Sequence, residues 1–162
     1  MASVDITIVV GPGETTSNTI KLVNRGLAAA LDYPLQFGRV FTPGAIPNYP
    51  RILIGGAAVV TQADVKNRWP DGSVKFAVLA AVLPMLPVGV PFVLSFGNQP
   101  SGNNTPLTQA QMFDADFGFN AGMLLNFVGG AVGEARARFM LAPGDYTLWT
   151  SGQIAQTIAL AG

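Results

Sequence analysis

The stretch Asn67-Arg68-Trp69-Pro70-Asp71-Gly72-Ser73-Val74-Lys75-Phe76 decides the fold. Its middle predicts a tight turn over 70–73, because Pro70 fixes one φ angle, Asp71 can accept a bond from the backbone that follows, and Gly72 supplies a positive φ. Apolar residues alternate before this turn, in 59–69, and form a nearly continuous run after it, in 74–83. The sequence therefore predicts a β-hairpin that pairs 59–69 with 74–83.

Further short strands, separated by proline and glycine turns, are expected along the chain. β-branched and aromatic residues predict them at 4–10, 20–23, 35–41, 51–56, 91–96, 117–127, 135–141, 146–150 and 153–160. Residues 27–31 have helical propensity for one or two turns at most. A short helix is expected over 107–113, with Thr105 as N-cap and Pro106 in its first position. The fold class is all-β, a barrel-like domain followed by a smaller β-rich segment with one short helix.

Residues 98–106 mark the expected domain boundary. Nearly all of them are Gly, Asn, Ser, Thr or Pro, a composition typical of a linker. The first domain is expected over 1–97, and 107–162 is expected to pack on it or to complete it.

The composition points to a subunit of an assembly. Apolar residues make up 49% of the 162 residues and charged residues 11%, against about 25% in a typical soluble domain. Nine basic and nine acidic residues leave no net charge, so neighbouring copies do not repel one another. We expect other subunits, including copies of this chain in a homo-oligomer, to cover part of the apolar surface.

Several classes of partner and location are disfavoured. No basic excess exists to neutralise nucleic-acid phosphates, and Arg136 and Arg138 are expected to share one solvated or salt-bridged strand face. The apolar run 76–94 is interrupted by Pro84, Pro87 and other turn residues, so it predicts strand, turn and strand and no membrane insertion. No disulfide is available without cysteine, and residues 1–5 do not begin a signal peptide.

Residues 62–77 resemble the W-x-D-G-S-V-[KR]-[WF] signature of the RIFT-barrel domains that precede the catalytic part of rhamnogalacturonan-lyase-like proteins. Gln62 matches an upstream glutamine of that family, and 42–45 (Thr-Pro-Gly-Ala) matches its proline-glycine loop. Residues 146–157 are similar to a W-x-S-G-P-V-A-T segment in related proteins of bacteriophages and prophages, with Gln153 and Ile154 in place of Pro and Val. The resemblance implies a RIFT-type barrel used as a module in carbohydrate-active enzymes or phage particles. It carries over no catalytic residue.

Trp69, Asp71 and Trp149 are the candidate binding residues, for a glycan or a partner protein. An aromatic ring beside a carboxylate is a common platform for a sugar. The alternative is structural: Trp69 packs across the hairpin, Asp71 caps the turn, and Pro70, Gly72 and Ser73 shape it.

No catalytic, metal-binding or cofactor-binding residues are predicted. Histidine is absent, Glu14 and Asp145 are isolated in the sequence, and Ser73 and Ser151 lack a neighbouring base. Asp114 and Asp116 are too few for a calcium loop and are interpreted as loop acids. Lyase chemistry can use a lysine, arginine or tyrosine base, and the three tyrosines (Tyr33, Tyr49, Tyr146) are available, but nothing convergent is visible in the sequence.

The sequence thus favours a non-enzymatic structural protein of a bacteriophage or prophage particle, tail-associated or on its surface. It would be made in the bacterial cytoplasm and located in the virion. The alternative is an accessory carbohydrate-binding N-terminal domain of a polysaccharide-lyase-like enzyme, located in the bacterial cytoplasm or secreted as part of that enzyme.

Overall fold

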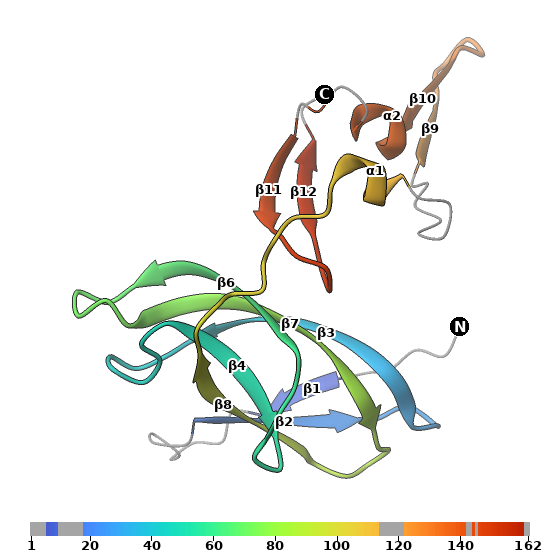
Figure 1. The fold of residues 1–162 in the computed structure, drawn as a ribbon. Coiled ribbons are helices and arrows are strands. Elements are labelled where there is room, and N and C mark those ends of the chain that lie inside the picture. Colours follow the sequence, from blue (N-terminus) through green and yellow to red (C-terminus); the bar gives the residue numbers. More distant parts are fainter. Residues whose placement is uncertain (1–5, 10–17, 114–121, 142–143, 145, 161–162) are drawn as a thin grey trace. The chain divides into compact units, whose positions relative to one another are not determined.

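The computed structural model describes residues 6–9, 18–113, 122–141, 144 and 146–160 (Figure 1). The chain divides into two compact units, residues 1–104 and 105–162. Both consist mainly of antiparallel strands, which confirms the all-β fold class.

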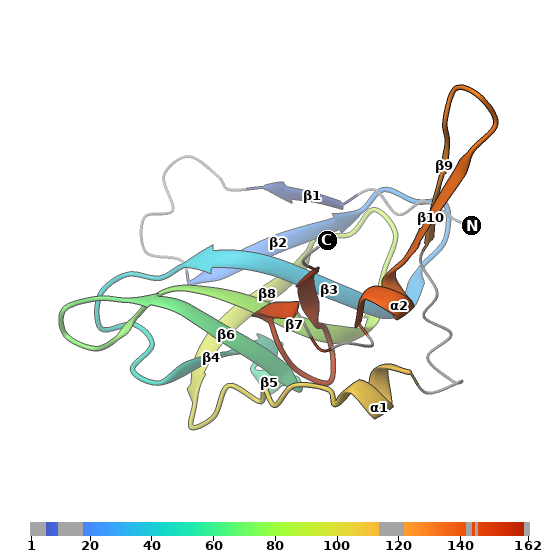
Figure 2. The same ribbon diagram turned by 90° about the horizontal axis from the view of Figure 1, so that it is seen from above.

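The first unit contains two antiparallel sheets (Figure 2). The five-stranded sheet has the order β1-β2-β8-β4-β5. Its strands are β1 (Ile6–Val9), β2 (Thr19–Asn24), β8 (Phe92–Gln99), β4 (Tyr49–Ile54) and β5 (Ala57–Ala58). The three-stranded sheet has the order β3-β7-β6, with β3 (Ala30–Val40), β7 (Val74–Leu86) and β6 (Thr61–Arg68).

A single apolar core lies between these sheets. Alternate residues of β7 face it, so that Ala77, Leu79, Ala81 and Leu83 are fully buried. The opposite sheet contributes Leu22, Ile52 and Leu94. Two sheets around one core agree with the expected barrel-like domain, whereas the RIFT-type identity stays a prediction.

The predicted hairpin is confirmed. β6 pairs with β7 from Thr61 opposite Ala81 to Arg68 opposite Val74, with register irregularities near Asn67. The run 76–94 is strand, turn and strand as predicted, but β7 continues through Pro84 to Leu86. Pro84 is tolerated there because the pairing with β6 ends at Ala81.

Other boundaries differ from the sequence prediction. Residues 27–29 form no helix, since the chain bends there and β3 begins at Ala30. β4 begins at Tyr49, ahead of the expected strand at 51. β8 continues to Gln99, because 97–99 pair with 49–51, so Asn98 and Gln99, which were expected in the linker, are strand. The segment after β8 still belongs to the first unit, because Ala63 N–H donates to the carbonyl of Gly102 at 2.7 Å.

The second unit consists of two hairpins and two short helices (Figure 1). β9 (Gly122–Asn126) pairs with β10 (Val132–Arg136), and β11 (Tyr146–Thr150) pairs with β12 (Thr157–Leu160). Helix α1 (Gln109–Met112) lies within the predicted helical segment, but its N-cap is Thr108, whose side chain and Gln111 form a capping box. Thr105 and Pro106 precede the helix.

Helix α2 (Ala137–Leu141) contradicts the predicted strand at 135–141. The alternation Ala-Arg-Ala-Arg-Phe fits a strand. However, a run this short does not distinguish the two-residue repeat of a strand from the 3.6-residue repeat of an α-helix. As a result Arg136 ends β10 while Arg138 lies in α2, so the two do not share one strand face. The expected strand at 153–160 is reduced to β12.

Candidate interaction surfaces

The motif turn is a three-residue hairpin loop. Gly72 N–H donates to the Trp69 carbonyl at 2.9 Å, and Trp69 N–H donates to the Ser73 carbonyl at 2.8 Å. Gly72 has φ +84°, the left-handed conformation that this loop type requires. Pro70 and Gly72 therefore occupy the loop positions that their backbone preferences predict.

Asp71 and Ser73 tie this turn to the loop over 41–48. The Ser73 hydroxyl and the Ser73 N–H both donate to Oδ1 of Asp71, at 2.6 and 2.9 Å. The same hydroxyl accepts from Gly44 N–H at 2.9 Å. These bonds from Ser73, above all the one from its hydroxyl, lower the pKa of the Asp71 carboxyl below its ordinary value. Asp71 is exposed, but one of its oxygens serves the turn.

Trp69 also contacts the loop over 41–48. Its indole N–H donates to the Phe41 carbonyl at 2.9 Å, and the Lys75 ammonium lies 4.6 Å from the ring centroid. The side chain is half-buried. Next to it, the Arg68 guanidinium donates to the carbonyls of Pro47 and Asn48. Asp71 thus accepts bonds within the turn and Trp69 contacts Lys75 on the other strand, as in the structural alternative stated for them. The bonds from Trp69 and Arg68 to the loop over 41–48 come in addition.

The third candidate, Trp149, lies on β11 in the second unit. It falls where the pairing of β11 with β12 is irregular, between Leu148 opposite Ile158 and Thr150 opposite Thr157. Its exposed fraction is 56%. Trp69 and Asp71 are close together in the first unit, so the three candidates do not form one site within either unit.

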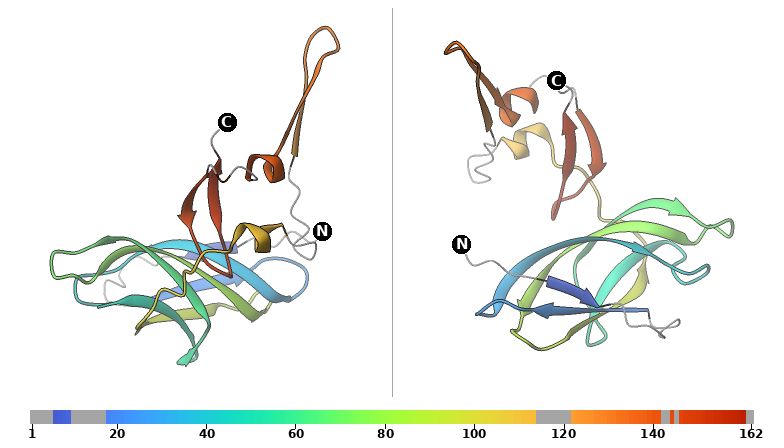
Figure 3. Two further views of the ribbon diagram at one scale, coloured as in Figure 1. Left: turned by 45° about the horizontal axis from the view of Figure 1, so that its top comes forward. Right: turned by 180° about the vertical axis from the view of Figure 1, so that it is seen from behind.

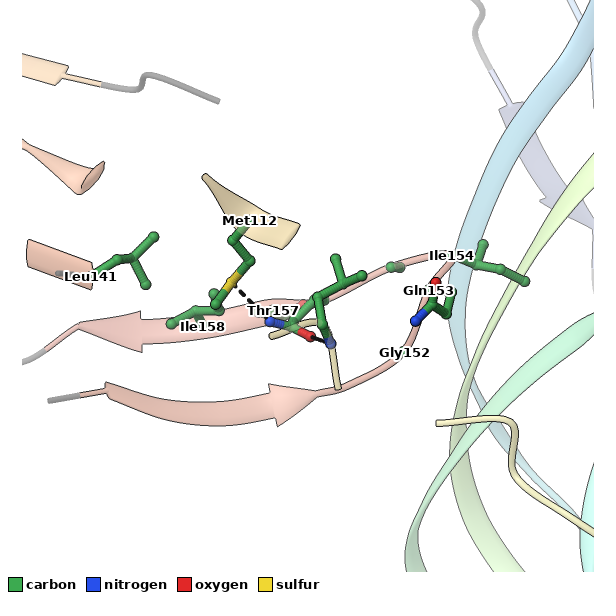
Figure 4. Close-up of a pocket in the computed structure, with 10 residues that line it drawn as sticks. Met112, Leu141, Gly152, Gln153, Ile154, Thr157 and Ile158 are labelled. Atoms are coloured by element: carbon green, nitrogen blue, oxygen red, sulfur yellow. Dashed lines mark hydrogen bonds between the residues drawn. The ribbon is translucent and has the colours of Figure 1, made fainter. Parts of the chain in front are cut away.

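A cavity of about 370 Å³ opens in the second unit (Figure 4). Met112, Leu141 and Ile158 make its wall largely apolar. Gln156 spans its polar edge, where Nε2 lies 3.1 Å from the Met112 sulfur and Oε1 accepts from Leu107 N–H. None of the described residues that line the cavity is ionisable, so the cavity itself supplies no acid or base.

The β9–β10 hairpin, residues 122–136, has an apolar face that the sequence analysis did not identify. Register pairs place Met123 beside Ala135 and Leu125 beside Gly133 on this face. Phe127 belongs to it too, because a Cβ atom added at Gly133 would lie 3.0 Å from the Phe127 ring. We call this set, Met123, Leu125, Phe127, Gly133 and Ala135, the apolar face.

The apolar face is open to solvent. Met123, Leu125 and Phe127 have exposed fractions of 59%, 47% and 56%. The hairpin extends beyond α1, α2 and the β11–β12 hairpin of its own unit (Figure 3). A usable signal was present in the sequence: from 123 to 135 the strands around Gly129-Gly130 carry only two polar side chains, Asn126 and Glu134.

The opposite face of the hairpin is mixed. Leu124, Glu134 and Arg136 lie there, and Nε of Arg136 is 2.6 Å from Oε1 of Glu134. Both side chains are exposed, so this ion pair neutralises local charge but adds little stability.

The described part of the chain contains no group of three acidic, histidine or cysteine side chains placed to hold a metal ion. Asp114 and Asp116 lie outside the described residues, as do Glu14 and Asp145. Among the described helices, neither is long and apolar enough to span a bilayer.

Comparisons of the chain with protein-family models, with curated proteins and with solved structures found no match.

Proposed function

We propose that this chain is a non-enzymatic structural subunit of a bacteriophage or prophage particle, tail-associated or on its surface, and that it acts through subunit contacts. The observation that carries the proposal is the β9–β10 hairpin, which exposes large apolar side chains on an extended arm. An isolated two-stranded hairpin is at best marginally stable in water, so an apolar partner is expected to cover it.

Two features of the whole chain support this function. The zero net charge and the low charged fraction permit close packing of many copies. The resemblance of residues 146–157 to a segment of bacteriophage and prophage proteins supports this kind of particle. The location that goes with this function is the virion, and we propose it on the same grounds.

Mass spectrometry of particles from the bacterium that encodes this chain tests the proposal. Particles induced and purified on a density gradient should contain the chain at a fixed ratio to the major structural proteins. The control is the soluble fraction of the same culture, in which the chain should be depleted after assembly. A chain that stays entirely in the soluble fraction while particles form would contradict the proposal.

The second candidate function is carbohydrate binding as an accessory domain of a polysaccharide-lyase-like enzyme. The exposure of Trp149 favours it, because an exposed indole offers a face on which a sugar ring stacks. A glycan array should then give a positive glycan whose binding Trp149→Ala abolishes. Trp69→Ala tests the first-unit platform in the same assay. Phe139→Ala, at an exposed aromatic residue of α2, is the matched control.

Gene neighbourhood separates the two functions without the protein. Tail and capsid genes beside this gene support the particle subunit. Genes for sugar uptake and polysaccharide degradation support the accessory domain.

A further inference from the structure

We propose that the guanidinium of Arg39, near the end of β3 in the first unit, binds a carboxylate. The carboxylate belongs either to a free organic acid or to an acidic side chain on a second copy of this chain. This inference goes beyond the proposed function, since it assigns a binding site that neither candidate function requires.

Arg39 is the last residue of β3 that faces the core. The alternation along β3 places it on the same face as Leu35 and Phe37, which pack in the core of the first unit. The central carbon of its guanidinium lies 4.2 Å from the centroid of the Phe96 ring and 5.3 Å from that of the Phe41 ring. These two rings are buried and meet edge to face. The guanidinium is therefore held in place by cation–π contacts with two aromatic rings.

Arg39 has no counter-charge among the residues that the structure describes. Its one hydrogen-bond acceptor there is the neutral Oδ1 of Asn18, 3.3 Å from Nη2. Nε is buried and has no hydrogen-bond partner. Burial lowers the pKa of the guanidinium, and no acidic neighbour offsets this effect. A partly desolvated cation without a counter-charge is costly, and a bound anion reduces that cost.

A second cation, Lys75, lies on the same face of the β3–β7 pair. It precedes by two residues Ala77, the register partner of Arg39, so the two cations are diagonal neighbours within reach of long side chains. The ammonium of Lys75 contacts the Trp69 ring and forms no ion pair with any described carboxylate. Asp71, the nearest acidic residue in the sequence, accepts hydrogen bonds within its own turn. The two cations thus give this end of β3 a positive local charge.

A carboxylate fits this site better than a larger anion. The side chain of Arg39 is half-buried, and Nη1 makes no hydrogen bond within the described part of the chain, so its N–H groups are available to a ligand. A guanidinium donates short, charge-assisted bonds to carboxylate oxygens. One partly buried cation with one neighbouring cation matches a singly charged group, whereas polyanions require an extended basic surface.

Nuclear magnetic resonance of the full chain, labelled with ¹⁵N-arginine, tests the site. The Nε–H resonance of Arg39 is identified by its absence from the Arg39→Lys variant. Sodium acetate should shift this resonance in a saturable manner, with half-saturation at roughly millimolar concentration. Sodium chloride at the same ionic strength should leave it unchanged. The resonance of Arg25, an exposed arginine of the same unit, is the matched control and should not respond to acetate.

Dilution without acetate distinguishes the two sources of the carboxylate. A side chain on a second copy predicts that the Arg39 resonance moves with protein concentration and that acetate reverses the effect. A free organic acid predicts a resonance that is independent of protein concentration and responds to acetate alone. Either result supports the site and identifies its ligand.

Three outcomes would overturn the proposal. The first is an Arg39 resonance that responds neither to acetate nor to dilution. The second is a shift that inorganic phosphate produces at lower concentration than acetate, since that result assigns the site to another anion. The third involves Glu14, which lies outside the described residues and is the acidic residue nearest to Asn18 in the sequence. If only the Glu14→Gln variant responds to acetate, the chain's own carboxylate occupies Arg39 in the wild type.

Discussion

At the scale of single residues, the Ser73 hydroxyl connects the motif turn to a second loop. It donates to Asp71 and accepts from Gly44 N–H, and the side chain is 4% exposed. A buried hydroxyl is inexpensive only when it is hydrogen-bonded, and here both its donor and its acceptor functions are used. The order Asp-Gly-Ser therefore has a structural role in the turn, independently of any ligand.

Acidification should weaken this turn through Asp71. Its pKa is lowered in the folded state below the ordinary 3.8, first by the Ser73 hydroxyl and then by the Ser73 N–H. A lowered carboxyl pKa contributes stability that is complete above the unfolded value and is lost as the pH falls through the folded value. Asp71→Asn keeps an acceptor but removes the charge. Urea unfolding should show wild type more stable than Asp71→Asn near neutral pH, with the gap closing below about pH 4.

Because Asp71 is exposed, that gap should also shrink in high salt. A difference between wild type and Asp71→Asn that persists unchanged in strong acid would show that the charge of Asp71 does not contribute. Asp32→Asn, at another exposed aspartate of the first unit, controls for the general loss of one negative charge.

Trp69→Phe tests the structural role of the indole. The substitution keeps an aromatic ring against Lys75 but removes the N–H donor to the Phe41 carbonyl. The free energy of unfolding should fall by about 1 kcal/mol, the usual worth of a hydrogen bond in a protein. Trp149→Phe should change stability much less, because that side chain is exposed. Thermal unfolding followed by circular dichroism measures both, and equal effects would argue against the bond to Phe41.

At the scale of elements, the chain from Gln99, the last residue of β8, to Asn103 is fixed to the edge of β6. Gly102 accepts from Ala63 N–H, while the side chains of Gln99 and Asn103 both donate to the Thr61 carbonyl. A segment with the composition of a linker is therefore ordered, because it makes three hydrogen bonds to one strand. Composition indicates local flexibility, but it does not reveal contacts with residues about 40 positions away in the sequence.

Gly102→Ala should destabilise the first unit. A Cβ atom at this position would lie 2.6 Å from the Ala63 carbonyl oxygen, and backbone cannot move away as a side chain can. The expected loss is about 1–3 kcal/mol, as for other overpacked sites. Gly97→Ala is the control, since its nearest contacts are flexible side chains of Leu53 and Arg51 at 3.3 and 3.4 Å. Denaturant unfolding of both variants measures the difference, and equal midpoints would contradict the steric argument.

The sequence predicts elements well where a periodic pattern is long and a turn is chemically specific. The β6–β7 hairpin has both, so its pairing and its turn were predicted from residues 59–83. The sequence-based prediction fails where contacts between distant parts of the chain determine the structure. β4 begins before Pro50 because, at that residue, β4 pairs only with β8 and the missing N–H faces no partner. The apolar face of the β9–β10 hairpin was missed because strand signals do not reveal which face stays uncovered.

At the scale of the whole molecule, the two units differ in how much they bury. The apolar core of the first unit comprises residues from both of its sheets, and all of them lie between Leu22 and Phe96. In the described part of the second unit, the buried apolar side chains are Leu107, Met112 and Leu141. Burial of apolar surface is the dominant favourable term in folding, so the second unit should be the less stable one.

The two tryptophans allow this difference to be measured, because each unit contains one of them. Trp149→Phe leaves Trp69 as the fluorescent reporter of the first unit, and Trp69→Phe leaves Trp149 as the reporter of the second. In urea, the Trp149 signal should change at a clearly lower concentration than the Trp69 signal, since separate cores unfold in separate transitions. The experiment belongs at low protein concentration, where association between copies cannot stabilise either unit by mass action. Coincident transitions under those conditions would mean that the two units share one cooperative core. A rise in the Trp149 midpoint with protein concentration, while the Trp69 midpoint stays constant, would show that copies of the chain associate through the second unit.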